Sequence, residues 1–266
     1  MTDHTDVNEK LNMDVVFNDN LEDIVGRNVP ATIRSSINEE FRSIKRTLLT
    51  VAFEQDDDQP KRNRVMVTSI NSCEGKTFTA IGLAKSVSNE RNKTVLLVDG
   101  DVLNPSLSKL LTPTPSHGLM DYLNDPTIDV PDIMCNTPSD GLKVITTGAG
   151  HHQANELLAS DIMNELMSEL NTRYSDRLVV IDAPPLMGVN ETLTMANKVD
   201  QIVIVIEEGK TKVSELKRIQ RALPKDVVVH FVLNKTLSQT EWRTHNDLES
   251  DTHQNDQVLT GANALH

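Results

Sequence analysis

A Gly-Lys-Thr triplet follows an apolar run early in the chain. Residues 65–77 read VMVTSINSCEGKT, so a strand-like segment enters a short loop that ends at Gly75, Lys76 and Thr77. In a phosphate-binding loop, main-chain N–H groups and the next helix N-terminus attract phosphate oxygens. The lysine then reaches the β- and γ-phosphates and the hydroxyl ligates Mg²⁺. These residues predict a site for a nucleoside triphosphate.

The loop departs from the usual spacing of such sites. A glycine is expected five residues before Gly75, and the chain has Ile70 there. Because a β-branched residue does not readily adopt positive φ, we expect Ile70 to keep extended or helical angles. Cys73 lies inside the loop where a glycine could stand. A redox function and a space-filling function are both open to it, and we expect the second because nothing in the sequence indicates a lowered thiol pKa.

Acidic residues follow two later apolar runs. TVLLVDGD supplies Asp99 and Asp101, and LVVIDAPP supplies Asp182. In a doubly wound sheet ligands bind beyond the carboxyl ends of the strands, so these carboxylates should converge beside Lys76. They could hold one or two Mg²⁺ ions and orient or deprotonate a hydroxyl group. The alternatives are turn or helix-capping functions for Asp99 and Asp101, and plain strand termination for Asp182.

The elements that must position these residues alternate along the chain. Near-continuous apolar runs, typical of strands buried on both faces, occur at 65–69, 94–99, 142–146, 178–182, 201–207 and 227–233. Helical spacing of apolar residues occurs at 35–53, 77–90, 156–172, 190–197 and 213–222. This order predicts an α/β fold, with a doubly wound, mostly parallel sheet and helices on both faces. Ser35 or Ser36 could cap the first helix.

Composition limits the organisation and the partners. Residues 1–34 are acidic and residues 238–266 polar and aperiodic, so we predict disorder in both and an α/β domain over 35–237. The net charge of −13 argues against nucleic acid as the main partner. We see no membrane span and no signal peptide, and expect a cytoplasmic protein. His151 and His152 could suggest a metal site, but we expect a polar loop because no third ligand has a telling spacing.

The motifs in this order resemble the bacterial tyrosine kinases, relatives of the Par/Min-type ATPases with a deviant P-loop. The segments HGLMDYL, GLKVITTGAG and VLNK agree with this family. The segments EGKTFTAI and ELLAS are similar to those of the autokinases encoded with exosortase and exopolysaccharide gene clusters. The resemblance covers about residues 35–237 and implies a Par/Min-like P-loop NTPase fold.

This resemblance also implies ATP and Mg²⁺ as cofactors and transfer of the γ-phosphoryl group to tyrosine. Lys76, Asp99 and Asp101 would be catalytic, while Thr77, Asp99 and Asp182 would hold the metal. The nucleotide would contact the loop and the VLNK segment, that is Asn71, Ser72, Cys73, Glu74, Gly75, Lys76, Thr77, Phe78 and Asn234.

The family resemblance implies partners as well. In EEFRSIKRTLL, the residues Glu39, Arg42 and Lys45 match a motif that packs subunits into a ring, so helix 35–53 would serve oligomerisation as a ring or a dimer. A membrane-embedded polysaccharide co-polymerase would be the partner, and could recruit the protein to the inner membrane. Lys45 stands where the family has arginine, and Leu103 where it commonly has a basic residue.

The tyrosines bear on the choice between two functions. The tail after residue 237 contains none, and the chain has only Tyr122, predicted in a short helix, and Tyr174. This pattern argues against autophosphorylation. One hypothesis is therefore an ATP-dependent protein-tyrosine kinase of an exopolysaccharide system whose acceptor lies on a partner. The other is an ATP-binding or slowly hydrolysing switch that controls the co-polymerase.

Overall fold

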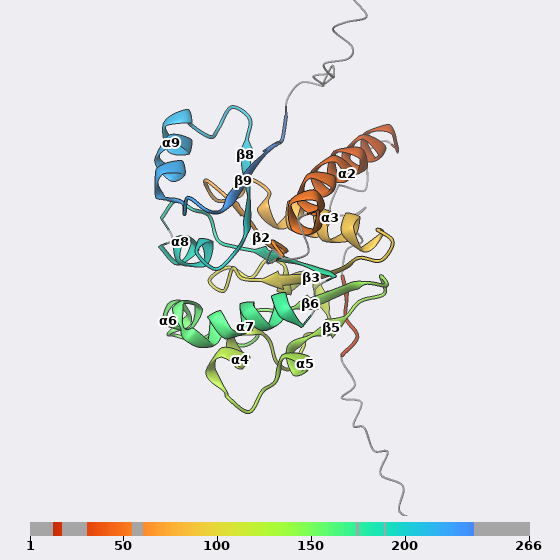
Figure 1. The fold of residues 1–266 in the computed structure, drawn as a ribbon, viewed down its shortest axis with the longest axis vertical. Coiled ribbons are helices and arrows are strands. Elements are labelled where there is room, and N and C mark those ends of the chain that lie inside the picture. Colours follow the sequence, from red (N-terminus) through yellow and green to blue (C-terminus); the bar gives the residue numbers. More distant parts are fainter. Residues whose placement is uncertain (1–12, 18–30, 55–60, 174–175, 189, 237–266) are drawn as a thin grey trace, which may run out of the picture. The chain divides into compact units, whose positions relative to one another are not determined.

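The computed structural model describes residues 13–17, 31–54, 61–173, 176–188 and 190–236 (Figure 1). The described residues up to Lys235 belong to one compact unit. In chain order the elements are β1 Val16–Phe17, α2 Ala31–Phe53, β2 Arg64–Ser69, α3 Lys76–Ser88, β3 Thr94–Asp99, η1 Ser108–Leu110, β4 Leu111–Thr112, α4 Leu119–Asn124, α5 Val130–Ile133, β5 Cys135–Asn136, β6 Leu142–Ile145, α6 Ala154–Ala159, α7 Asp161–Thr172, β7 Arg177–Asp182, α8 Asn190–Ala196, β8 Gln201–Glu207, α9 Val213–Ala222 and β9 Val228–Asn234.

The strands form one seven-stranded sheet in the order β5-β6-β3-β7-β2-β8-β9, beside a two-stranded sheet of β1 and β4. All neighbours in the large sheet are parallel except β5, which runs antiparallel to β6. Each strand that the apolar runs predict is present within one residue of its expected bounds. The predicted mostly parallel α/β sheet is confirmed.

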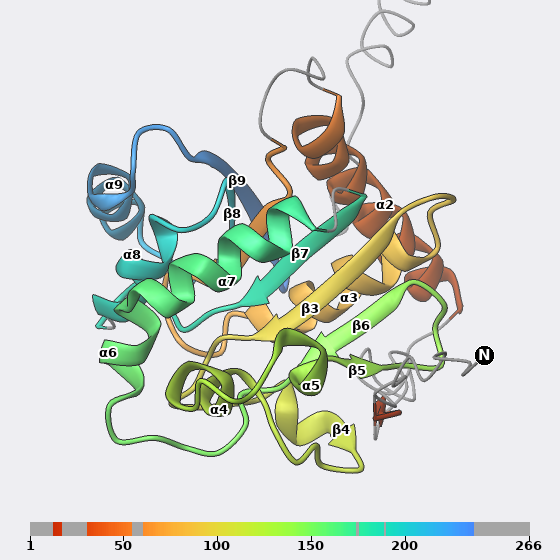
Figure 2. The ribbon, with the colours of Figure 1, turned by 60° about the horizontal axis from the view of Figure 1, so that its bottom comes forward.

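Helices cover both faces of this sheet because its central strands bury side chains on both sides. In β2, Val65 and Val67 pack with α2 and α3, while Met66 points to the opposite face. On that face α4 to α9 supply the other side of the core (Figure 2). The core therefore has two apolar layers, with the sheet between them.

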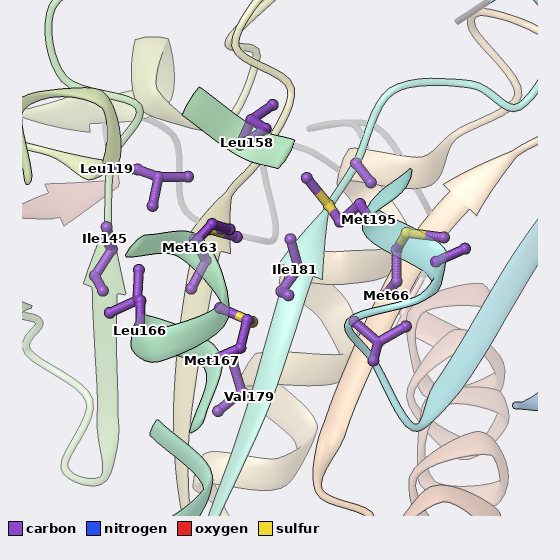
Figure 3. Packing of buried hydrophobic residues seen from close by; sticks show 14 of the residues in the cluster. Met66, Leu119, Ile145, Leu158, Met163, Leu166, Met167, Val179, Ile181 and Met195 are labelled. Atoms are coloured by element: carbon purple, nitrogen blue, oxygen red, sulfur yellow. The ribbon is translucent and has the colours of Figure 1, made fainter. Parts of the chain in front are cut away.

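The larger layer lies between the sheet and α7. Met163 and Met167 point toward Ile181 and Val179 on β7, and Leu166 lies beside Ile145 on β6 (Figure 3). Burial of large apolar side chains of this kind contributes about 1.5–3 kcal/mol each relative to exposure. This layer fixes the strand whose end carries Asp182.

The predicted single helix over 156–172 is wrong in one respect. Ser160 is extended between α6 and α7, and its hydroxyl accepts a 3.3 Å hydrogen bond from the Met163 amide. The serine thus ends one helix and caps the next. Ile162 lies in the predicted apolar helix but is exposed.

Helix α2 begins four residues earlier than the sequence predicts, so Ser35 and Ser36 lie within it and do not cap it. Phe41 and Leu48 are buried against α3. A Cβ at Gly82 of α3 would lie 2.2 Å from the Phe41 ring, so this glycine permits the close helix contact.

The predicted disorder of residues 1–34 does not hold for the whole segment. Val15 is fully buried, β1 pairs with β4, and the Val15 amide donates to the Asn136 carbonyl at 2.9 Å. Residues 1–12 and 18–30, and the predicted disordered tail, lie outside the described residues. None of the described helices is both long enough and apolar enough to cross a membrane.

Candidate nucleotide-binding site

The Gly-Lys-Thr triplet joins β2 to α3 as the sequence predicts. Gly75 is the N-cap of α3 and has φ 101°. A Cβ at this position would lie 2.1 Å from the Asn234 side-chain nitrogen, so both the backbone angle and the space require glycine. The first N–H groups of α3 have no partner within the helix and are the donors that a phosphate would meet.

A second left-handed residue in the loop is Cys73, with φ 66°. The side chain is exposed, so the expectation that it fills space is wrong. It stands where the chain needs a conformation that favours glycine. Ile70 is buried and is absent from the described residues with positive φ, as predicted.

Two lysines, one following β8 and one following β9, contact main-chain carbonyl groups of the loop. Lys235 donates to the Cys73 carbonyl at 2.6 Å and pairs with Glu207 at 3.0 Å. Lys210 lies 3.5 Å from the Ser72 carbonyl and 3.2 Å from the same Glu207. These contacts fix the main chain of the loop.

Glu74 stabilises the loop through hydrogen bonds to its side chain. Its side chain is fully buried and accepts hydrogen bonds from the Asn71 amide at 2.9 Å and the Thr211 hydroxyl at 2.6 Å. The Asn234 amide donates to the Glu74 carbonyl at 2.8 Å. Glu74 therefore braces the loop, and Asn234 lies beside it. The contact of both residues with the nucleotide stays a prediction.

Lys76 is buried and faces two carboxylates. Its ammonium lies 2.7 Å from Asp101 and 3.5 Å from Asp182. Burial lowers the pKa of Lys76, but Asp182 and Asp101 together raise it above the ordinary value. The lysine is thus charged and held where incoming phosphates would compete with carboxylates.

Thr77 and Asp182 form the second contact across the site. The threonine hydroxyl donates to the Asp182 carboxylate at 2.6 Å. Burial raises the pKa of Asp182 to about 7, because the loss of hydration outweighs the attraction of Lys76. A cation placed here would favour the charged carboxylate.

Asp99 sits beside Asp182 in the register of β3 and β7 but has different partners. One of its oxygens accepts hydrogen bonds from both the amide and the hydroxyl of Ser108, each at 2.7 Å. The other accepts from the Asp101 amide at 3.2 Å. Burial raises the pKa of Asp99 to about 6, while the Ser108 hydrogen bonds oppose this.

These residues fit a magnesium ion that is completed by phosphate and water. The described part of the chain has no group of three His, Cys, Asp or Glu side chains that could hold a metal alone. Mg²⁺ commonly takes one or two protein ligands and several phosphate or water oxygens. The Thr77 hydroxyl and the Asp182 carboxylate, already in contact, provide such a pair.

Other predicted positions lie outside this centre. The Phe78 ring packs on Phe41 with centroids 5.6 Å apart, so only its main chain faces the loop. Tyr122 lies in α4, as predicted, and Tyr174 lies outside the described residues. His151 and His152 stack on each other in a loop, which agrees with the predicted polar loop.

Sequence reasoning missed the residues that support the site. Ser108, Thr211, Glu207 and Lys235 contact site residues from distant loops and strand ends. No spacing in the sequence signals them. Among these four residues only Lys235 has a local signal in the sequence, because it directly follows the predicted site residue Asn234.

A phosphate loop whose lysine faces two strand-end carboxylates, at the carboxyl edge of a parallel α/β sheet, defines a P-loop nucleotide-binding protein. Residues 65–260 match the family model described as the CobQ/CobB/MinD/ParA nucleotide binding domain.

Comparison with similar proteins specifies the class of P-loop nucleotide-binding protein further. The chain is 32% identical over 199 residues to the tyrosine-protein kinase YwqD of Bacillus subtilis, covering 74% of this chain and 80% of that protein. It is 30% identical to the succinoglycan biosynthesis transport protein ExoP of Rhizobium meliloti, over 76% of this chain but only 25% of ExoP. The solved kinase domain of VpsO is 25% identical, with a TM-score of 0.63, and the match covers 78% of this chain and all of that one. The chain belongs to the bacterial tyrosine-protein kinases within the MinD/ParA-type nucleotide-binding family.

Proposed function

We propose that this protein is an ATP- and Mg²⁺-dependent protein-tyrosine kinase of an exopolysaccharide biosynthesis or export system. The observation that carries the proposal is the set of buried Lys76, Asp101 and Asp182 with half-buried Thr77, joined by contacts of 2.6 to 3.5 Å. The carboxylates lie around the lysine where phosphate oxygens would bind. The kinship with YwqD supports tyrosine as the acceptor.

Each residue then has a distinct task. Bound ATP·Mg²⁺ supplies the phosphoryl group and neutralises charge on it. Lys76 would bind phosphate oxygens in place of its carboxylate partners, and Thr77 and Asp182 would hold the metal. Asp101 loses its lysine partner in this exchange and becomes free to accept the proton of a tyrosine hydroxyl. Asp99 is held by Ser108 and sets the position of the Asp101 main chain.

The acceptor tyrosine belongs to another protein in this proposal. Tyr122 is half-buried in α4, and burial with nearby Glu169 and Glu165 raises the pKa of its hydroxyl. It is therefore a poor acceptor, and the sequence after residue 237 has no tyrosine.

The partner would be a membrane-embedded polysaccharide co-polymerase. The likeness to ExoP, which is named a succinoglycan biosynthesis transport protein, supports such a partner. The co-polymerase would recruit the kinase to the inner membrane.

Helix α2 would support a homo-oligomer, as a ring or a dimer. Glu39 and Arg42 pair with each other on an exposed face, while Lys45 turns to Glu90 of the same chain. The contact surface would therefore depend on Glu39 and Arg42. If so, Glu39→Ala with Arg42→Ala should lower the mass measured by light scattering, whereas an unchanged mass would contradict this interface.

The decisive experiment measures label transfer. The full chain is incubated with γ-labelled ATP, Mg²⁺ and a Glu-Tyr copolymer, beside Lys76→Met and Asp182→Ala. We expect labelled copolymer from the native chain and none from Lys76→Met or Asp182→Ala. The control is Lys217→Met, whose side chain is exposed on α9, and it should label the copolymer as the native chain does.

A second candidate is favoured because Tyr122 is a poor acceptor and the sequence after residue 237 has no tyrosine. If the native chain releases free phosphate and labels neither itself nor the copolymer, the regulatory switch is the better function. Absence of label, phosphate release and any nucleotide-dependent thermal shift would contradict both candidates.

A further inference from the structure

Strand β9 is an open edge of the seven-stranded sheet. Among the described residues it pairs only with β8, and it is the last strand in the sheet order. Its sequence VVHFVLN contains no charge, no proline and no glycine. Natural proteins usually protect such an edge with lysine, proline, a bulge or a covering element, because unpaired main-chain groups invite another strand.

The main-chain groups that face outward are identified by the bonds on the inner side. The Val228 amide donates to the Asp200 carbonyl, and the Glu208 amide donates to the Asn234 carbonyl. In a parallel ladder the N–H and C=O of one residue point to the same neighbour, and direction alternates along the strand. The outward groups therefore belong to Val229, Phe231 and Leu233.

The same three residues share one face of the sheet. Val229 packs partly on the core, whereas Phe231 is 51% exposed and Leu233 is 47% exposed. An aromatic ring and a leucine are thus left in solvent directly beside an unpaired strand edge. A partner that adds a strand here would cover both.

We propose that β9 pairs antiparallel with β9 of a second copy of this chain, about a two-fold axis at Phe231. In this register Phe231 lies opposite the partner's Phe231, and Val229 lies opposite the partner's Leu233. All of these are hydrogen-bonded pairs, so each outward main-chain group finds an acceptor or donor. In a register shifted by one residue, the outward main-chain groups of one copy would lie opposite residues of the partner that are already bonded to its β8. Those outward groups would then stay unpaired.

Side-chain chemistry supports a copy of the same strand as the occupant. The exposed apolar row of one copy meets an identical row, with aromatic against aromatic at the centre. At the ends, the partner's Lys235 falls opposite Val227, next to the exposed Lys225 and Asp226. Lys235 keeps Glu207 of its own chain as its partner, so the centre of this interface stays uncharged.

Sedimentation equilibrium of the full chain over a range of concentrations tests this surface. We expect a dimer whose dissociation constant rises at least tenfold in Phe231→Lys. Val213→Lys is the matched control, since Val213 is an apolar residue of α9 that is 65% exposed and lies away from the edge. A monomer at all concentrations, or a dimer equally stable in Phe231→Lys, would overturn the proposal.

Cross-linking tests the register. Opposed residues of a hydrogen-bonded antiparallel pair have Cα atoms about 5.5 Å apart, within disulfide range. In a Cys73→Ser background, Phe231→Cys should form a covalent dimer on mild oxidation, and Leu233→Cys alone should not. A dimer that dissociates in the Glu39→Ala, Arg42→Ala variant but fails to cross-link through position 231 would leave the α2 surface as its interface and contradict the β9 pairing.

Discussion

The Lys235 ammonium donates a 2.6 Å hydrogen bond to the carbonyl of Cys73, a non-glycine residue with φ 66°. Such a backbone conformation costs on the order of 1–3 kcal/mol and persists only where its surroundings hold it. Here Lys235 and its partner Glu207 supply that support from the end of β9 and β8. The phosphate loop keeps its bend without a glycine at position 73.

We therefore expect Lys235→Met to weaken nucleotide binding about tenfold in a calorimetric titration. Cys73→Gly removes the steric cost of positive φ, so Lys235→Met should weaken binding much less in a Cys73→Gly background. If the two substitutions are additive, Lys235 acts on the nucleotide directly and not through the loop.

Gly75→Ala should damage both stability and binding. The new Cβ would meet the Asn234 side chain at 2.1 Å, and φ 101° strains any residue with a Cβ. We expect a loss of at least about 2 kcal/mol in the free energy of unfolding, measured in urea. Adding Asn234→Ala should recover part of this loss, because it relieves the contact but not the angle. Complete recovery would mean that the angle contributes nothing.

Asp182 should make the nucleotide-free protein less stable as the pH rises. Its pKa is about 7 in the folded chain, against an ordinary value near 4, so folding favours its protonated form. This contribution is full below about pH 4 and is lost as the pH rises through about 7.

The variant that isolates this effect is Asp182→Asn. Relative to the native chain, it should be more stable at pH 8 than at pH 5, by a difference of about 2.5 kcal/mol. Urea denaturation without nucleotide measures this at both pH values, while magnesium-dependent nucleotide binding should be lost. An unchanged difference between the two pH values would contradict the proposed environment of Asp182.

Ser108→Ala should raise the pKa of Asp99. The serine hydroxyl donates to the Asp99 carboxylate at 2.7 Å, and a hydrogen bond to the charged form lowers a carboxyl pKa. From about 6, we expect a rise of about one pH unit, followed by carbon NMR of the carboxyl group. Ser108→Thr should retain the native value. A native value in Ser108→Ala would show that the Ser108 amide alone sets the charge.

Patterns along the chain predict the sheet and the centre of the site. Continuous apolar runs predict strands buried on both faces, and carboxyl ends of parallel strands share one edge of a sheet. Lys76, Thr77, Asp101 and Asp182 therefore converge as expected. These positions follow from local pattern and one rule of topology.

Which side chains face the site and which support the loop depends on how distant segments meet in the fold. Glu74 and Phe78 lie in the loop motif but turn to Thr211 and Phe41. Asp99 is held by Ser108, and Cys73 by Lys235, across separations that leave no periodic signal. Such contacts depend on how strand ends and loops meet in space. The phosphate loop is thus predictable as a motif, but its strained angle and its supports are properties of the fold.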